Sequence, residues 1–337
     1  MTNFTKFVER TRVRCGTPVA IGAGPTGLAV GWAGGAPSWG YGVTAWSAEG
    51  KERFSHQIEM RIHSVTLGQA GEVVIAGSSG IVVIEPCGTL IAPRLVADEL
   101  HDGAEGAVGR LSDGSVVAAL AITGEVDGQW RSELWLVRRD CQGGWSEHLL
   151  KLEDELSPIV HVDLVSLPEP GWICVSLGTT EGSASFVVDV LESPPRCFAL
   201  HRSLPNGAVP IEFVAADMSL VVVDQQYRVS WLGEEGLLGV LDGAELVDAV
   251  CPASGGRSVG FGGGSLGLGM ACALMPRGFV AVVDTVRKSL SVAQAPGGLF
   301  VRSEIIHAAP TGHLAAYQQG ELVLYEHVAD ALRVNKG

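Results

Sequence analysis

The sequence predicts an all-β protein built from repeated units, and three observations support this prediction. Short segments rich in Val and Ile, for example residues 73–76, 116–120 and 279–283, recur along the chain between Gly, Pro, Ser and Asp. Sustained helical periodicity is nearly absent. Glycine accounts for 45 of the 337 residues without a collagen-like period, so it marks turns.

One module of two apolar segments joined by a tight turn recurs along the whole chain. Its seven instances repeat roughly every 47 residues and have as turn markers Gly27, Gly71, Gly114, Gly171, Met218, Gly278 and Gly312. A four-stranded β-propeller blade takes about 40 to 50 residues. Such blades stack around an axis because a single blade cannot bury both of its faces. The spacing therefore matches one blade per module.

On this period and topology, the chain resembles the seven-bladed β-propeller superfamily. The resemblance implies one domain over residues 1–337, with about seven four-stranded blades and a short tail at 328–337. Six or eight blades remain open, because residues 243–264 are irregular. The signature of WD repeats does not recur, since Gly312-His313 is the single Gly-His pair and Trp-Asp never occurs. No narrower family is therefore assigned.

The two ends of the chain predict how the ring closes. Only one clear strand, residues 321–326, follows the seventh module, so the last blade is one strand short. Residues 5–13 precede the first module and have the pattern of an unpaired strand. We expect this N-terminal strand to complete the last blade, because closure removes an exposed sheet edge.

Charge and hydropathy restrict the classes of partner. The net charge of −14 disfavours nucleic acid, because an acidic surface repels phosphate. The basic residues Lys6, Arg10, Arg12 and Arg14 share one strand face, which we interpret as solvated. No apolar signal segment or run of about 18 apolar residues occurs. We expect a cytoplasmic monomer that binds no membrane.

The cysteines and histidines predict no metal site and no cofactor. The seven cysteines are widely spaced without a Cys-x-x-Cys pair, so we expect free thiols. The nine histidines form neither His-x-His nor His-Glu-x-x-His. His161 and Asp163 lie two apart and share a strand face, an arrangement that is more typical of a structural or solvated pair than of a metal site.

Two further motifs occur without the context that their chemistry needs. Gly22, Gly24 and Gly27 have the spacing of a dinucleotide fingerprint, but glycines and a proline interrupt the helix that must follow. We interpret this motif as a blade turn. Gly-x-Ser-x-Gly occurs at Ser258 and Ser265, inside a glycine-rich segment that lacks the strand and helix of a nucleophile elbow.

The propeller resemblance also implies where a site lies. Starts of inner strands and loops between second and third strands meet on one face, around the central channel. Candidate ligand-binding residues there are Trp39, Tyr41, Trp130, Arg110, Glu212 and Glu304. Candidate acid–base residues are His63, Glu105, His161, Asp163 and His307. Each of these side chains has a plainer alternative role, which is to satisfy hydrogen bonds between blades.

Two functions remain open on the sequence alone. The first is a non-enzymatic propeller that binds a protein partner or a small polar ligand at the channel face. The alternative is a small-molecule enzyme with lyase, cyclase or hydrolase chemistry, in which His, Asp and Glu transfer protons at the channel mouth. A deep polar funnel would favour the enzyme, and exposed aromatic side chains would favour the binder.

Overall fold

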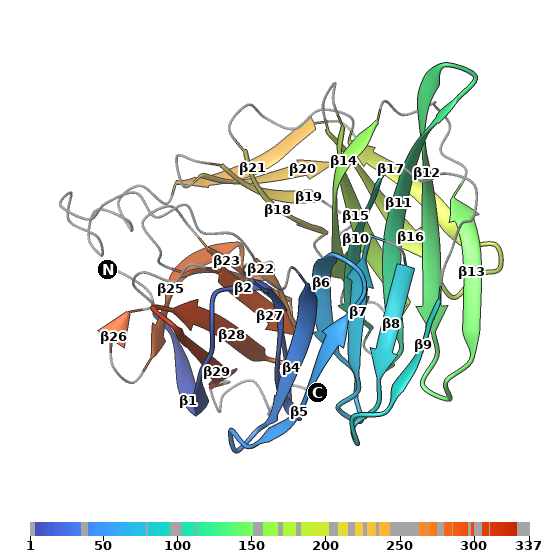
Figure 1. Cartoon of the computed structure of the whole chain (residues 1–337). Helices are drawn as coiled ribbons and strands as arrows, with labels where there is room; N and C mark the ends of the chain where they lie inside the picture. Colours follow the sequence, from blue (N-terminus) through green and yellow to red (C-terminus); the bar gives the residue numbers. More distant parts are fainter. Residues whose placement is uncertain are drawn as a thin grey trace.

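The computed structural model shows a protein made of strands (Figure 1). It describes residues 4–328 except for 35–39, 79, 95–102, 112, 151–157, 168–170, 180–182, 202–207, 215–219, 225–227, 234–235, 243–262, 268, 275–279, 285, 296–297, 300–304 and 310. Within these described residues, no helix is long and apolar enough to cross a membrane.

Five separate four-stranded antiparallel sheets, or blades, follow one another along the chain. The first contains β2 (Pro18–Gly24), β3 (Gly27–Ala33), β4 (Tyr41–Ser47) and β5 (Glu52–Ile58). The second contains β6 (Ile62–Leu67), β7 (Val73–Gly77), β8 (Gly80–Ile84) and β9 (Leu90–Arg94). The third contains β10 (Gly103–Arg110), β11 (Val116–Val126), β12 (Gln129–Arg139) and β13 (Trp145–Leu150).

The fourth blade contains β14 (Ile159–Ser166), β15 (Trp172–Thr179), β16 (Ser183–Asp189) and β17 (Arg196–His201). The fifth contains β18 (Ala208–Val214), β19 (Leu220–Asp224), β20 (Arg228–Gly233) and β21 (Gly236–Asp242). A nine-stranded sheet follows. One part of it is β22 (Gly263–Gly267), β23 (Met270–Leu274), β24 (Val280–Asp284), β25 (Ser289–Ala295) and β26 (Gly298–Leu299).

The other part of this sheet contains β27 (Ile305–Ala309), β28 (His313–Gln318) and β29 (Glu321–His327), completed by the N-terminal β1 (Phe4–Arg14). Strand β1 pairs antiparallel with β29 and, over Phe4–Lys6, parallel with β25. In Figure 1 the blue β1 accordingly lies beside the red C-terminal strands. The prediction that the N-terminal strand completes the last blade is therefore confirmed.

The first strands of the sheets form a closed ring. Strand β2 contacts β6 and β27, β6 contacts β10, and β10 contacts β14. The ring continues from β14 to β22 and from β22 to β27, while β18 contacts β22. The first strand of each sheet therefore faces the centre, and the fourth strand lies outermost.

The hydrophobic core lies between neighbouring sheets, so most central strands are buried on both faces. Strand β7 shows this arrangement. Val73 and Ile75 pack in the cluster shared with the first blade, whereas Val74 and Ala76 pack in the cluster shared with the third. Burial on both sides explains why such strands are continuous apolar runs rather than alternating ones.

The inner strands approach each other closely, and this requires small residues. A Cβ atom at Gly22 of β2 would lie 3.0 Å from the carbonyl oxygen of Val65 in β6. The dinucleotide-like motif around Gly22 consequently forms a β-hairpin, in which strand β3 stands where the fingerprint needs a helix.

The predicted blade turns that the structure describes are tight turns. Positive φ angles, which favour glycine, occur at the markers Gly27, Gly71, Gly114, Gly171 and Gly312. Met218 and Gly278 lie outside the described residues, as does the tail beyond residue 328.

We predict that deletion of residues 1–14 lowers the melting temperature by at least about 10 °C, because it exposes β25 and β29 and removes buried apolar side chains. Thermal unfolding followed by circular dichroism measures this. Melting within a degree or two of the full chain would contradict the closing role of β1.

A matched pair of point variants separates burial from strand pairing. Phe7 is 3% exposed and Val8 is 42% exposed on the same strand. We expect Phe7→Ala to destabilise by about 3–5 kcal/mol and Val8→Ala by well under 1 kcal/mol.

Candidate functional site

The two ends of the blades differ in the connections they carry. We call the end where first strands begin and second strands turn into third strands the mouth face. The opposite end, which carries the turns from first to second strands, is the turn face. The candidate residues are described below by their place on these two faces.

The structure joins His63 of β6 and Glu105 of β10. The His63 Nδ1 atom lies 3.0 Å from Glu105 Oε2, and the His63 side chain is 8% exposed. A carboxylate that holds an imidazole in this way fixes the orientation of the ring. The pair joins two neighbouring blades near the start of their first strands, and it is the one His–carboxylate ion pair among the predicted residues that the structure describes.

His161 and Asp163 lie on the same face of β14, as predicted. His161 is exposed and stands opposite Gly178, while Asp163 is partly buried. Burial raises the pKa of Asp163, although the Leu164 N–H, 2.8 Å from Asp163 Oδ1, and His161 favour its charged form. This pair lies on β14, which contacts the β10 strand of Glu105 in the ring.

His307 of β27 has a structural partner. Its Nδ1 atom accepts a hydrogen bond from the Ala23 N–H of β2 at 3.3 Å. Burial lowers the pKa of His307 to about 4, so the imidazole is neutral at pH 7. His307 therefore joins the last blade to the first, which is the plainer role that the sequence left open.

Several ligand-binding candidates are placed differently or lie outside the description. Arg110 is the last residue of β10, at the turn face, and does not share the mouth position of Glu105. Glu212 lies in β18, and its side chain is not described. Trp39 and Glu304 lie outside the described residues.

The aromatic residues of the first blade mainly pack. Tyr41 begins β4 and is partly buried against the core of the first two blades. The Trp32 indole N–H donates to Thr44 Oγ1 at 3.2 Å, and its ring occupies the space above Gly42. These two side chains are thus held by their own blade.

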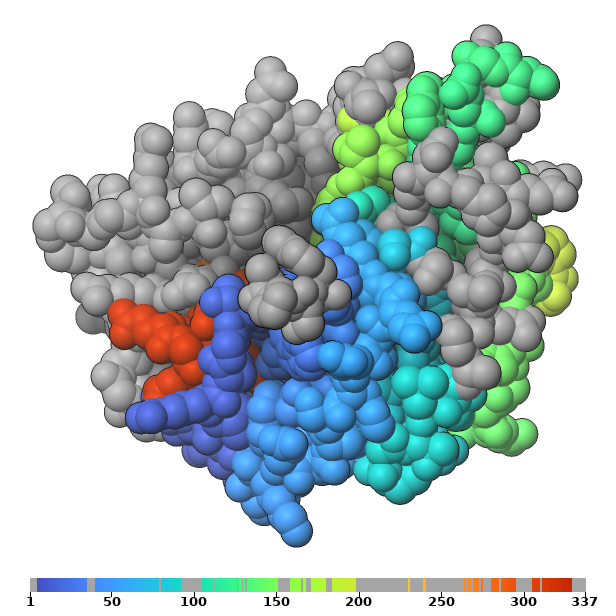
Figure 2. Space-filling view, viewed as in Figure 1, coloured from blue at the N-terminus to red at the C-terminus, as the bar shows by residue number. Residues whose placement is uncertain are grey.

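Trp130, in contrast, stands on a projecting hairpin. Pairing of β11 with β10 ends at Thr123, and pairing of β12 with β13 begins at Leu134. The intervening end of the hairpin extends beyond both neighbours and rises at the upper right of Figures 1 and 2. Trp130 near its tip is 52% exposed.

The projecting hairpin is firmly built. Asp127 and Gly128 have φ angles of 52° and 77°, as a type I′ turn requires. At its base, the hydroxyl groups of Thr123 and Ser132 lie 2.7 Å apart, and Ser132 Oγ accepts the Ile159 N–H of the fourth blade at 2.9 Å. The tryptophan is therefore presented by a fixed element.

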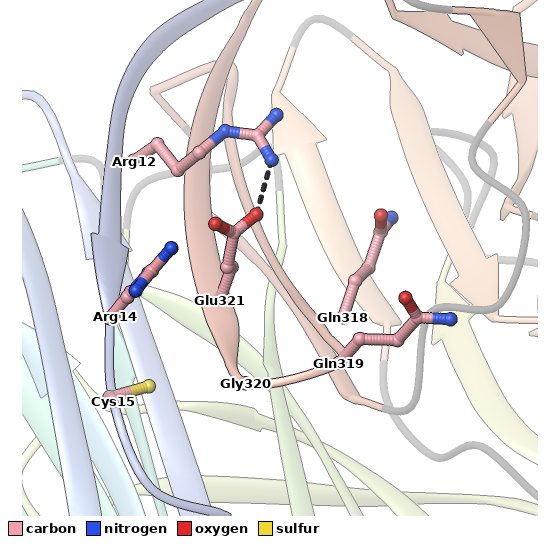
Figure 3. A pocket seen from close by; sticks show the side chains of 7 residues that line it. All are labelled: Arg12, Arg14, Cys15, Gln318, Gln319, Gly320 and Glu321. Atoms are coloured by element: carbon pink, nitrogen blue, oxygen red, sulfur yellow. Dashed lines mark hydrogen bonds and ion pairs between the residues drawn. The ribbon is translucent and has the colours of Figure 1, made fainter.

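A pocket of about 920 Å³ lies on the mouth face where β1 meets the turn between β28 and β29. Figure 3 shows Arg12 and Arg14 from β1 on one side, and Gln318 and Gln319 from the turn on the other. Gln318 ends β28 directly before this second-to-third turn.

Arg12 is fixed in this pocket by two acids. Its Nη1 lies 2.5 Å from Glu321 Oε2, and its Nη2 lies 2.9 Å from Glu9 Oε2. These hydrogen bonds raise the pKa of Arg12, and the Arg12 hydrogen bond lowers the pKa of Glu9. Arg14 is exposed and has no hydrogen-bond or ion-pair partner among the described residues.

The sequence showed only half of this pocket. Arg12 and Arg14 were visible on one strand face, but the opposing acid Glu321 becomes visible only through the register Arg14↔Glu321. The Arg10 guanidinium likewise pairs with Glu326. Two of the four cations on this strand face, Arg10 and Arg12, are thus paired with acids of β29.

The cysteines and the metal-ligating residues add no site to the described part of the chain. Cys15, in the pocket wall, is partly buried, and burial raises its pKa to about 11, so it is a thiol at neutral pH. The six cysteines that the structure describes are thiols that form no disulfide bond. No group of three or more His, Cys, Asp or Glu among the described residues is arranged to hold a metal ion.

No protein-family model and no curated protein match this sequence. Solved structures match its fold. YCF48 bound to a D1 peptide has a TM-score of 0.56 at 11% identity, covering 95% of this chain and 96% of that one. BBS1N in complex with ARL6DN has a TM-score of 0.54 at 10% identity, covering 97% and 98%. The Dos1 propeller has a TM-score of 0.51 at 10% identity, covering 95% of each chain.

This likeness shows the fold and nothing beyond it. Together with the sheets of four antiparallel strands, it confirms the prediction of an all-β propeller closed by the N-terminal strand, and the sheets are roughly consistent with the expected number of blades.

We predict that His307 makes the fold sensitive to acid. Burial lowers the pKa of His307 from 6.5 to about 4. The contribution of neutral His307 to the free energy of unfolding is therefore complete above pH 6.5, and up to about 3 kcal/mol of it is lost as the pH falls toward 4. His307→Asn keeps an acceptor for the Ala23 N–H and removes the titration. Denaturant unfolding at pH 7 and pH 4.5 should show a smaller loss for the variant. Equal losses would contradict this role.

We predict that Asp163→Asn stabilises the fold at neutral pH. Burial raises the pKa of Asp163 above 3.8, so its charged form destabilises the folded state at higher pH. The amide keeps the acceptor for Leu164 without a charge. The gain should be present at pH 7.5 and absent at pH 3.5, where the carboxyl is protonated in both states. A gain that is independent of pH would argue against buried charge as its cause.

Proposed function

We propose that this protein is a propeller that binds a protein or peptide partner on its mouth face, with Trp130 as the main anchor. The observation that carries the proposal is the β11–β12 hairpin, which projects past its neighbouring strands and exposes a tryptophan. Tryptophan is among the residues that contribute most to protein interfaces, because one rigid side chain buries a large area.

The mouth face also offers polar contacts beside this anchor. The pocket lined by Arg12, Arg14, Gln318 and Gln319 opens on the same end of the blades as the hairpin tip. Arg14 has no described partner and is available to a carboxylate of the bound chain. An apolar anchor with polar groups around it is the usual composition of a protein interface.

Two of the similar propellers are complexes with protein ligands by name, YCF48 with a D1 peptide and BBS1N with ARL6DN. Their identities of 11% and 10% carry over no partner and no residue. They support only the general proposal that this fold here also serves as a binding scaffold.

An enzyme that works at the mouth face is the second candidate, and the His63–Glu105 pair favours it. An imidazole oriented by a carboxylate is suited to act as a general base, and a substrate would have to reach the His63 Nε2 atom, which is buried. The two candidates differ in the residue they depend on. Loss of turnover in His63→Gln, with the melting curve unchanged, would favour the enzyme over the scaffold.

We predict that Trp130→Ala weakens partner binding at least about 30-fold, the loss typical of an interface hot spot, without lowering the melting temperature. Proteins captured from the source cells by wild type and variant would be quantified by mass spectrometry. The partner lost by the variant would then be titrated in purified form.

Leu191 provides a matched control, because it is 50% exposed and follows β16 at the turn face. We expect Leu191→Ala to retain the partner. If Leu191→Ala abolished binding and Trp130→Ala did not, the partner would bind the turn face and the proposal would be wrong.

A further inference from the structure

Several buried polar atoms without a hydrogen-bond partner lie at the turn-face ends of the first and third blades. They are Thr26 Oγ1, Arg110 Nε and Nη1, and Arg139 Nε. Thr26 lies in the turn of the first blade, Arg110 at the end of β10 and Arg139 at the end of β12. We call these three residues and Glu72, which lies just before β7, the Glu72 cluster.

Arg110 is the most buried charge of this cluster. It is 8% exposed, and its backbone is fixed because Ser166 Oγ donates to the Arg110 carbonyl at 2.6 Å. Burial lowers the pKa of Arg110 while Glu72 opposes that change, but a guanidinium stays charged in a protein. Two nitrogen atoms of this charged guanidinium, Nε and Nη1, therefore remain buried without a hydrogen-bond partner.

One carboxylate serves two guanidinium groups in this cluster. Glu72 Oε1 lies 3.8 Å from Arg139 Nη1, and Glu72 Oε2 also accepts the Ala70 N–H at 3.1 Å. Asp113 lies in the turn that follows β10, but Ser115 and Arg138 already occupy its carboxylate. Among the described residues, the Glu72 cluster consequently holds two guanidinium groups and one carboxylate, and the Arg110 guanidinium is the buried one.

Two neutral groups border the same place. A Cβ atom at Gly71 would lie 3.2 Å from Thr26 Oγ1, so the Thr26 hydroxyl lies beside the β6–β7 turn that carries Glu72, where Arg53 Nη1 also donates to the Gly71 carbonyl at 2.9 Å. His313 of the last blade interacts electrostatically with Arg110, and burial is the main reason that the pKa of His313 is lowered. Neither group supplies the missing negative charge.

We propose that the Glu72 cluster binds a small oxyanion through Arg110, with Arg139 and Thr26 as further donors. The chemistry is that shared by phosphate and carboxylate, whose oxygens accept the N–H groups of a guanidinium in pairs. A water molecule would accept the hydrogen bonds but would leave the buried excess charge, which is costly. This site lies at the opposite end of the blades from the proposed partner surface and does not depend on it.

The test is the melting temperature and calorimetric titration of the full chain with sodium phosphate, with sodium acetate and with sodium chloride at equal ionic strength. We expect phosphate or acetate, at about 100 times its Kd, to raise the melting temperature by about 3 °C over chloride. A response to phosphate alone assigns a phosphate group, and a response to acetate alone assigns a carboxylate. No difference from chloride would overturn the proposal.

The variants locate the response. Arg110→Met should lower the affinity for the anion at least about tenfold. Arg61→Met, which removes an exposed arginine before β6, should leave that affinity unchanged. If Arg110→Met does not fold, Thr26→Val serves in its place. We expect Thr26→Val to lower the affinity for the anion about fivefold, since a buried hydroxyl donor is lost. Wild-type affinity in the Arg110 variant, or in Thr26→Val when that variant replaces it, would overturn the assignment.

Discussion

Burial of both faces of every sheet is the constraint on which this structure depends. A four-stranded sheet of apolar strands is stable only between two neighbours, and a row of such sheets has two unsatisfied ends unless it closes. Strand β1 completes the closure. It is antiparallel to β29 and parallel to β25, so one strand ties the last two groups of the sheet together before the chain enters the first blade. Phe7 and Val13 then lie in the cores on either side of that junction.

The same constraint explains why the sequence predicted so much of the fold. Strands buried on both faces appear as apolar runs, tight turns need glycine, and one blade sets one period, so each signal is local. Even the closing strand was visible, because the last module lacked a strand and residues 5–13 supplied one. Contacts between blades left no such signal. That His63 meets Glu105, and that His307 meets the Ala23 amide, depends on the register of strands that are far apart in sequence.

The aromatic residues show the limit of composition as evidence for a site. Trp32 and Trp130 both adjoin second-to-third connections, yet Trp32 packs because Gly42 opposite leaves room for its ring. Trp130 is exposed because β11 and β12 are 11 residues long, whereas β10 has eight and β13 six. The sequence contained part of this information, since Asp127-Gly128 between two apolar runs is a strong hairpin signal. The length of the neighbouring strands, which decides what projects, was not visible.

Close packing at the centre of the ring also determines the role of the polar residues there. First strands approach so closely that a polar side chain there must find its partner on the next blade. Ser166 does so at the Arg110 carbonyl, and His307 does so at the Ala23 amide. Around Glu72, the described parts of neighbouring blades bring two guanidinium groups to one carboxylate, and the nearby Asp113 is already bound by Ser115 and Arg138. The physical requirement that makes most inner polar groups structural is therefore also the reason that this one cluster points to a ligand from solution.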